Sequence, residues 1–174
     1  MKIAISGSVG VGKTALATKL SEKLKFEVVH LNEIAQKFKL SDIKELQTFD
    51  FDVQKCIDYI EDKYKLKDNI IFEGHFAHLL HPKFIDFIVI INRDLKELHQ
   101  EYINREYNTQ KITDNLEVES LNVCFYEAEE EGYEEDQFIV IENTHHIDIE
   151  DIVNELKSKI ERKKVVLQKI ERKR

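Results

Sequence analysis

The residues from Gly7 to Thr14 read GSVGVGKT, with the spacing G-x-x-x-x-G-K-[ST], between a short apolar run and a helical pattern. Glycine lets backbone N–H groups approach a polyphosphate that a Cβ atom would hold away, and Gly7, Gly10 and Gly12 meet that need. A helix that begins near Lys13 points the positive end of its dipole at the same anion. We expect Lys13 to reach the β- and γ-phosphate oxygens of ATP and the Thr14 hydroxyl to bind Mg²⁺.

A carboxylate near the metal is the second requirement of this chemistry, and such acids commonly stand at the end of a neighbouring apolar strand. Glu73 follows the apolar run NIIF and is the best placed acid in the chain. Asp86 precedes its own apolar run, so we expect it at the opposite edge of the sheet. The alternative is that Glu73 caps a helix formed by the following HFAHLL.

Three histidines follow the NIIF run, at positions 75, 78 and 81. A zinc site is the alternative that they raise, but the trio lacks a nearby cysteine, and His81 precedes a proline, where a helix ends. We expect His75 at the phosphate site and the other two in local packing. His145 and His146 follow the last apolar run, and we expect them in a loop near the nucleotide base.

Arg93 and Arg105 are the arginines that precede the C-terminal tail, and planar guanidinium groups are suited to clamping phosphate oxygens. Arg93 follows a predicted strand. Arg105 stands at the entry to a polar break at residues 108–114, where a small lid can close and exclude water. Surface salt bridges are the alternative role for both side chains.

Apolar runs alternate with helical patterns along most of the chain, which is typical of a parallel sheet with helices on both faces. The expected strands are residues 3–6, 26–31, 69–72, 85–91 and 138–141. The expected helices are residues 14–25, 32–38, 50–64, 94–106, 115–131 and 148 to the end. We therefore predict an α/β fold with a five-stranded parallel, doubly wound sheet, in which ligands bind beyond the carboxyl ends of the strands.

The composition fits one domain over residues 1–174. Hydrophobic residues make up 42% and charged residues 34%, as in a soluble globular protein. No apolar run is long enough for a membrane span or a secretory signal, so we expect a cytoplasmic protein without a membrane partner, with Cys56 and Cys124 as reduced, buried thiols. The net charge is −8, but residues 161–174 hold seven Lys or Arg against two Glu. This basic tail can contact RNA or an acidic partner, or simply complement a helix dipole.

Five segments occur in the order GSVGVGKT, LNE at 31–33, FEGHFAHLL at 72–80, NR at 92–93 and TDNLEVE at 113–119. Together they resemble the adenylate kinase isoenzyme six family, especially its archaeal-type members, and the resemblance extends from residue 1 to about 160. It implies a P-loop NTPase fold of the nucleoside monophosphate kinase type. The implied parts are a CORE, an acceptor-binding region at about residues 31–67 and a short LID at about 105–114. Apolar periodicity and charge add a basic C-terminal helix at about 148–174.

The resemblance also implies a reaction, ATP + AMP ⇌ 2 ADP with Mg²⁺, accompanied by ATPase activity. Eukaryotic members of the family also serve small ribosomal subunit maturation and bind a ribosomal protein. Residue patterns and resemblance together nominate as catalytic Lys13, Glu73, His75, Arg93 and Arg105. The nucleotide-binding candidates are Gly10, Val11, Gly12, Lys13, Thr14, Ala15, Arg105 and His145, and the metal candidates are Thr14 and Glu73, the latter through water.

The chain departs from the family between Leu40 and Lys67, where relatives often carry an arginine and this chain has none. Lys37, Lys39 or Lys44 can supply positive charge there, although an ammonium group recognises phosphate less geometrically than a guanidinium group. Two other functions therefore stay open. One is an ATPase that acts as a small ribosomal subunit assembly factor, with a ribosomal protein or pre-ribosomal RNA as partner. The other is a P-loop kinase with another small acceptor.

Overall fold

A computed structural model gives the fold of residues 1–143 and 148–171, with side chains described up to residue 162. The main sheet has five parallel strands in the order β2-β5-β1-β6-β7. These strands are β1 (Lys2–Ser6), β2 (Glu27–His30), β5 (Ile70–Glu73), β6 (Phe87–Asn92) and β7 (Phe138–Glu142). The predicted α/β fold with five parallel strands is confirmed, and each strand ends within two residues of its predicted range.

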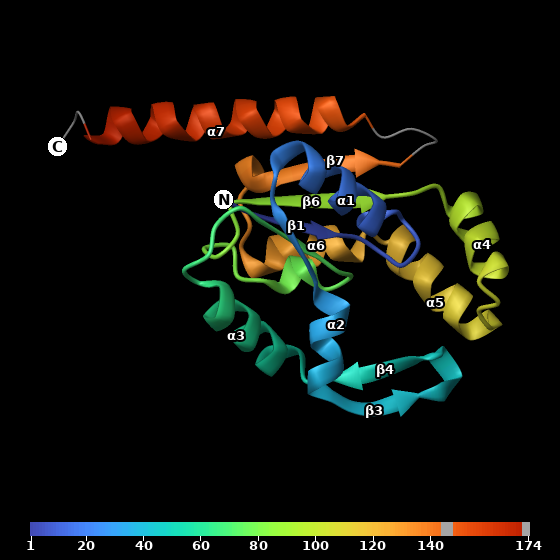
Figure 1. The fold of residues 1–174 in the computed structure, drawn as a ribbon. Helices are drawn as coiled ribbons and strands as arrows, with labels where there is room; N and C mark the ends of the chain where they lie inside the picture. The colour runs from blue at the N-terminus through green and yellow to red at the C-terminus, as the bar shows by residue number, and fades with distance from the viewer. Residues whose placement is uncertain (144–147, 172–174) are drawn as a thin grey trace.

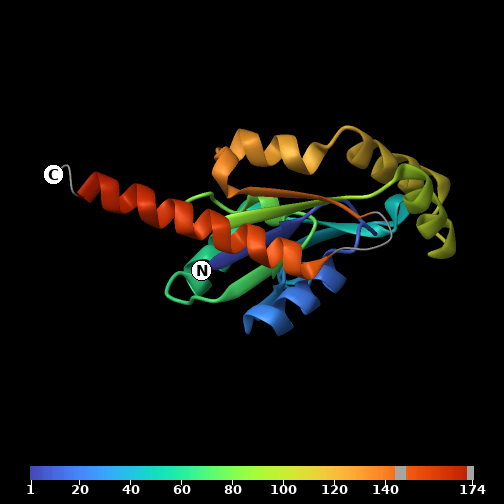
Figure 2. The ribbon, with the colours of Figure 1, turned by 90° about the horizontal axis from the view of Figure 1, so that it is seen from above.

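Helices cover both faces of this sheet. One face carries α1 (Lys13–Leu24) and α7 (Ile149–Glu171), and the other carries α3 (Val53–Tyr64) and α6 (Val123–Glu131). Figure 2, seen from above, shows α7 crossing the sheet on a different side from α6. Successive side chains of a strand point to opposite faces, so Ala4 packs with the α3 and α6 side while Ile5 packs with the α1 and α7 side.

The carboxyl ends of the strands form the edge from which the glycine-rich loop leaves the sheet. β1 pairs with β5 on one side and with β6 on the other, so Ile5 lies beside Glu73 and beside Val89. The remaining helices are α2 (Leu31–Ala35), α4 (Leu95–Asn104) and α5 (Thr109–Ser120). In Figure 1 the strand arrowheads of β6 and β7 point toward the side where α4 and α5 lie.

An antiparallel β-hairpin follows α2, and the sequence analysis did not predict it. Its strands are β3 (Lys39–Ile43) and β4 (Thr48–Phe51), and a 3-10 turn at Lys44–Leu46 joins them. Residues 39–42 are all exposed, so β3 carries no alternating apolar pattern that would reveal a strand. The helix expected from residue 50 begins instead at Val53, after Asp52 accepts a capping hydrogen bond from the Lys55 N–H at 3.1 Å.

The polar break expected at residues 108–114 is wrong, because α5 begins inside it. Asn108 Oδ1 accepts a hydrogen bond from the Lys111 N–H at 2.9 Å and so caps the helix. The single helix expected over residues 115–131 is also wrong. Asn122 has a φ of +50°, a left-handed conformation that an α-helix does not contain, so the chain turns there between α5 and α6.

The C-terminal helix α7 runs back over the sheet, and its later part extends beyond the end of the sheet in both views (Figures 1 and 2). The side chains of residues 163–174 lie outside the described part of the chain, so the contact of the basic tail with RNA or an acidic partner stays a prediction. Across residues 1–143 and 148–171, no helix is both long enough and apolar enough to cross a membrane.

The core beneath α3 and α6 is rich in aromatic side chains. Phe72 on β5 is fully buried and packs edge-on against Tyr64, with ring centroids 5.5 Å apart. The two cysteines, Cys56 and Cys124, are buried and unpaired as expected, and burial raises the pKa of each thiol to about 11. Both therefore act as small apolar core residues.

Removing the Phe72 ring is expected to destabilise the whole domain. Phe72→Ala should lower the free energy of unfolding by about 3–5 kcal/mol, because it removes buried apolar area and leaves a cavity. Leu66→Ala is the control, since Leu66 is 92% exposed, and it should change stability by about 0.5 kcal/mol or less. Urea unfolding followed by circular dichroism measures both. A loss no larger for Phe72→Ala than for the control would contradict this packing of the core.

Candidate active site

The glycine-rich loop between β1 and α1 takes backbone conformations that require glycine. Gly10 and Gly12 have φ values of +82° and +103°, in the left-handed region. The space around them is also closed. A Cβ atom on Gly10 would lie 3.1 Å from the Tyr102 ring, and one on Gly12 would lie 2.8 Å from Asn143 Nδ2. Conformation and crowding together explain why the motif has glycine at both positions.

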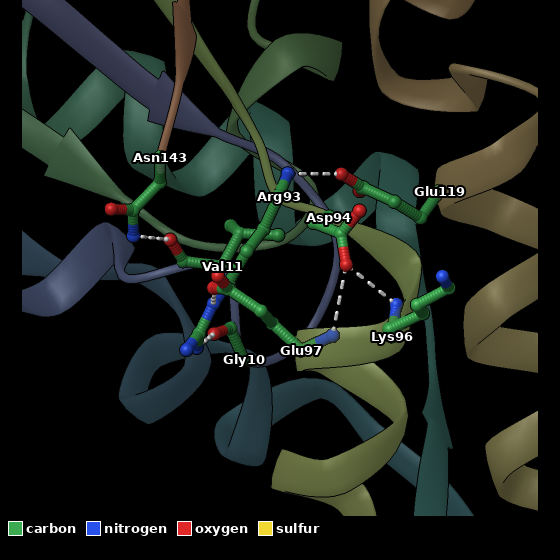
Figure 3. Close-up of polar contacts among 8 residues, drawn as sticks. All are labelled: Gly10, Val11, Arg93, Asp94, Lys96, Glu97, Glu119 and Asn143. Atoms are coloured by element: carbon green, nitrogen blue, oxygen red, sulfur yellow. Dashed lines mark hydrogen bonds and ion pairs between the residues drawn. The ribbon is translucent and has the colours of Figure 1, made fainter. Parts of the chain in front are cut away.

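Side chains from three other parts of the fold hold the carbonyl oxygens of this loop. The donors are Tyr102 Oη to Val9 O at 2.6 Å, Arg93 Nη1 to Gly10 O at 3.0 Å and Asn143 Nδ2 to Val11 O at 2.7 Å (the last two in Figure 3). In a trans peptide the C=O and the following N–H point in opposite directions. The N–H groups of Gly10 and Gly12, which follow Val9 O and Val11 O, are therefore turned away from Tyr102 and Asn143, as a loop that binds phosphate through its backbone requires.

Lys13 is buried at the start of α1, and its ammonium group binds two carbonyl oxygens at the start of the loop. Nζ donates to Gly7 O at 2.9 Å and to Ser8 O at 2.7 Å. An ammonium group has three donors, so one stays available for a phosphate oxygen. Burial lowers the pKa of Lys13 to about 8, although the nearby Glu73 charge works in the opposite direction. The side chain is therefore still mainly charged at pH 7.

Thr14 and Glu73 stand side by side at the same edge of the sheet. The Thr14 hydroxyl donates to Glu73 Oε1 at 3.2 Å, and His30 Nδ1 lies 2.9 Å from Glu73 Oε2. These contacts aim the carboxylate at the loop. Hydroxyl and carboxylate oxygens are ligands that Mg²⁺ prefers, together with phosphate and water, so the pair fits the predicted metal. The alternative role of Glu73 as a helix cap is wrong, because HFAHLL forms only a 3-10 turn at Ala77–Leu79, without a side-chain cap.

Of the two histidines predicted to pack locally, His78 is buried, while His81 is exposed and makes a local hydrogen bond. His78 is buried, with Nδ1 2.7 Å from Ser6 Oγ and Nε2 2.7 Å from Glu127 Oε2, and burial lowers its pKa. His81 Nδ1 accepts a hydrogen bond from the Lys83 N–H at 3.1 Å. A search of the described residues finds no group of three His, Cys, Asp or Glu side chains that could hold a metal ion, so the zinc alternative has no support there.

His75 lies at the mouth of the loop, apart from the other two histidines. Its ring keeps an exposed face, but the crowding of surrounding protein atoms, and then the Lys13 charge, lower its pKa to about 4. The ring is therefore neutral at pH 7, and one of its nitrogen atoms can accept a hydrogen bond.

A cavity of about 430 Å³ lies over the loop, and we call it the phosphate cavity. Both arginines predicted to bind phosphate reach it. The Arg93 Nε lies 3.1 Å from Glu97 Oε2, and the Arg105 Nε lies 2.8 Å from Glu101 Oε1. Each guanidinium group keeps further N–H donors beyond these ion pairs. The lining residues include Gly10, Gly12, Lys13, Thr14, Ala15, Glu73, His75, Arg93 and Arg105.

Not every predicted nucleotide-binding residue faces this cavity with its side chain. Val11 is fully buried beneath the loop, so its contribution is the backbone alone. Ala15 is exposed and lines the cavity. His145 falls within residues 144–147, outside the described residues.

Two further cavities adjoin the loop. The hairpin cavity, of about 520 Å³, lies between the β3–β4 hairpin and α5, with Phe49, Arg105, Lys111 and Asn115 in its lining. It shares Val9, Asn32, His75 and Arg105 with the phosphate cavity. The apolar cavity, of about 350 Å³, lies behind the loop and is lined by side chains such as Phe51, Phe76, Leu79 and Val118.

Sequence reasoning missed five residues that the fold brings to this site. They are Tyr102 and Asn143, which bind loop carbonyls; His30, which contacts Glu73; Lys111, in the hairpin cavity; and Glu119, which is only 7% exposed and contacts Ser8. Of the lysines proposed instead for acceptor charge, Lys37 lies over the Tyr59 ring and Lys39 pairs with Asp42. Two of the five missed residues had a usable signal, since Asn143 lies two residues after a predicted strand and Glu119 ends the TDNLEVE segment that carries the family resemblance.

Comparison with protein families identifies the loop and the sheet as parts of a known type. A family model described as "AAA domain" matches residues 3–122. A "Putative adenylate kinase" of Methanocaldococcus jannaschii is 35% identical over 175 aligned positions, which cover 95% of this chain and 92% of the relative. An "Adenylate kinase isoenzyme 6 homolog" of Schizosaccharomyces pombe is 32% identical over 74% of each chain.

Solved structures share the fold at lower sequence identity. A deoxyadenosine kinase from M. mycoides superposes with a TM-score of 0.54 at 21% identity, over 91% of this chain and 100% of that chain. A shikimate kinase from Aquifex aeolicus superposes with a TM-score of 0.51 at 15% identity, over 95% and 99% of the two chains. These similarities establish a P-loop kinase fold.

Adding a methyl group to Gly10 is expected to abolish tight binding of polyphosphate. Gly10→Ala should weaken the affinity for inorganic tripolyphosphate by about tenfold or more, because the left-handed backbone becomes strained and the new Cβ meets the Tyr102 ring. Gly132→Ala is the matched control. Its φ is +96°, but it ends α6 and its added Cβ would find no atom nearer than 3.9 Å. Isothermal titration calorimetry distinguishes them, and equal affinities in the two variants would contradict the assignment of the loop.

Proposed function

We propose that this chain, which belongs to the same P-loop family as these adenylate kinase relatives, transfers the terminal phosphoryl group of ATP to AMP. Its relatives and its fold make it a phosphotransferase enzyme. The observation that carries the proposal is the loop itself, whose carbonyls are held by neighbours while Lys13 keeps a free donor. The phosphate cavity over the loop then receives the triphosphate of ATP.

Mg²⁺ is part of the proposed function. Thr14 would hold the ion directly and Glu73 through water, with the phosphate oxygens completing its coordination. When bound, the ion neutralises charge on the phosphates. His30, through its contact with Glu73, would keep that carboxylate in place.

The acceptor is proposed to enter from the hairpin side. The hairpin cavity touches the phosphate cavity at His75 and Arg105, so a group bound there lies next to the end of the triphosphate. Lys111 supplies the cation for a monophosphate, since it lines the cavity and its ammonium group has three donors, while the structure gives its Nζ one hydrogen bond, to Gln47 O at 2.8 Å, and a cation–π contact 4.1 Å from the centre of the Tyr107 ring. The adjoining apolar cavity, with Phe51 and Phe76 in its wall, suits a purine ring.

Transfer then needs charge stabilisation more than base catalysis. The attacking oxygen of AMP already carries negative charge, so no strong base is required. Arg93 and Arg105 would stabilise the charge on the group in transit, and Lys13 would hold the β- and γ-phosphates. His75, which is neutral at pH 7, would orient the acceptor through a hydrogen bond.

ATP hydrolysis at the same site is the second candidate. It is favoured by the position of His75, because a neutral imidazole that faces all three cavities can accept a hydrogen bond from the attacking water and orient it. Hydrolysis would proceed without AMP, so ATP turnover with and without AMP separates the two reactions. A role in small ribosomal subunit assembly rests on the family resemblance and on the basic tail, and it stays a prediction.

Lys111 offers a direct test of the acceptor site. Wild-type protein should form ADP from ATP and AMP in a coupled assay, and Lys111→Ala should raise the KM for AMP by about tenfold or more with little change in the KM for ATP, because a charge-assisted hydrogen bond to phosphate is lost. Lys96→Ala is the control, since Lys96 is an exposed lysine on α4. Absence of AMP-dependent ADP formation in the wild type would refute the proposed reaction, and equal KM values for AMP in both variants would refute the role of Lys111.

Glu73 offers the corresponding test of the metal. Glu73→Gln should raise the Mg²⁺ concentration needed for half-maximal activity by about tenfold or more. The reason is that a neutral amide replaces the carboxylate proposed to hold the metal-bound water. Asp86→Asn is the control, because Asp86 accepts a hydrogen bond from the Lys2 N–H at 2.8 Å at the opposite edge of the sheet. A magnesium titration of initial rates measures both, and an unchanged midpoint in Glu73→Gln would exclude Glu73 from the metal site.

A further inference from the structure

We propose that Glu119 is a positioning residue that joins helix α5 to the phosphate loop, so that closure of the acceptor site and the geometry of the loop are coupled. This inference rests on the proposed function, since it assigns a partner to the same loop. None of the predicted site residues has this role. The observations that carry it are the contacts at the two ends of α5.

At the C-terminal end of α5, Glu119 binds two parts of the site at once. One carboxylate oxygen accepts a hydrogen bond from the Ser8 hydroxyl, inside the loop. The other accepts the backbone N–H of Arg93 at 2.5 Å, at the end of β6 (Figure 3). Ser8 and Glu119 are 3% and 7% exposed, so water does not compete for these bonds. One side chain therefore sets the position of Ser8 relative to the segment that carries Arg93.

A direct phosphate contact does not explain Glu119. A carboxylate repels a polyphosphate, and a buried one is costly unless it is hydrogen-bonded. Burial raises the pKa of Glu119, while its bonds to Ser8 and Arg93 act in the opposite direction. The charge of Glu119 disfavours a bound phosphate, yet both of its carboxylate oxygens accept hydrogen bonds at the site. We therefore assign it the role of holding Ser8 and the Arg93 backbone in place.

At the N-terminal end of α5, the helix binds the tip of the β3–β4 hairpin. Asn108 Nδ2 donates to Glu45 O at 2.6 Å, and the Asn108 N–H donates to Gln47 Oε1 at 3.1 Å. Lys111 Nζ donates to Gln47 O at 2.8 Å. Leu46 and Lys111 line the hairpin cavity, so the helix that binds the hairpin tip beside the proposed acceptor site is the one that carries Glu119.

The 12 residues of α5 form one helix, and an intact helix moves as a unit. A shift of the hairpin tip, such as one that admits or releases an acceptor, therefore reaches Ser8 through Glu119. Coupling between two ligand sites is reciprocal, so acceptor binding and ATP binding should each strengthen the other through this contact.

The experiment compares Glu119→Ala, Glu119→Gln and Ser8→Ala with Glu117→Gln, an exposed acid on the same helix, as control. The side-chain amide introduced by Glu119→Gln can still accept from the Arg93 N–H and donate to Ser8 Oγ, so this conservative variant should rescue the contact. We expect kcat to fall about tenfold or more in Glu119→Ala, less in Ser8→Ala, and by less than about threefold in Glu119→Gln.

Coupling is measured without turnover, by calorimetry of the β,γ-imido analogue of ATP in the presence and absence of AMP. In the wild type and in Glu117→Gln, AMP should strengthen binding of the analogue. In Glu119→Ala that strengthening should be lost while some affinity for the analogue remains. A residue needed only for stability would lower the midpoint of thermal unfolding and leave this ratio unchanged.

Several results would overturn the proposal. A folded Glu119→Ala protein with the kcat and coupling of the control would do so, and so would a Glu119→Gln protein as impaired as Glu119→Ala, because charge rather than hydrogen bonding would then matter. If Glu119→Ala does not fold, Ser8→Ala decides, and full activity in that variant contradicts the inference. If the wild type makes no ADP from AMP, the proposed function fails, and the same variants are then compared by their rates of ATP hydrolysis.

Discussion

Every backbone carbonyl from Gly7 to Val11 is held by a side chain that comes from outside this stretch. Lys13 holds the first two, and residues after β6, on α4 and after β7 hold the others. A buried carbonyl without a partner is costly, so these bonds stabilise one loop conformation. Tyr102 and Asn143 hold their carbonyls from outside the phosphate cavity, so the N–H groups of Gly10 and Gly12 are turned away from these two donors. The shape of the site thus depends on the hydrogen bonds that the loop carbonyls accept. The surrounding strands and helices position the side chains that donate those bonds.

The order of the strands explains why these groups meet. β1 lies at the centre of the sheet, between β5 and β6, so the loop that leaves it is flanked by Glu73 on one side and by Arg93 on the other. The chain then crosses to β7, which brings Asn143 next to Gly12. Parallel strands present all these ends at one edge, which is where ligands bind in doubly wound sheets.

Charge around the loop is balanced before any ligand binds. Arg93 and Arg105 are each paired with an acid on α4, and Lys13 is stabilised by the charges of Glu73 and Glu119. Of the three, only Lys13 is buried, and a buried cation without such partners would be costly in a low-dielectric site. A phosphate group that enters the cavity competes with these acids for the cations. The net charge of −8 belongs to the whole chain, whereas the loop has its own local group of cations, so the two are compatible.

Local sequence patterns were enough for much of this protein. The loop motif, the five parallel strands and the positions of Glu73 and Arg93 at strand ends follow from spacing and apolar runs, because those patterns depend on neighbouring residues. The hairpin, the start of α5 at Thr109 and the turn at Asn122 did not, since exposed polar strands and caps leave no periodic signal. The loop contacts of Tyr102, Asn143 and Glu119 were beyond sequence reasoning for a stronger reason. These residues contact the loop from 93, 132 and 111 residues away, and only the packing of helices on the sheet decides which side chain reaches which carbonyl or hydroxyl.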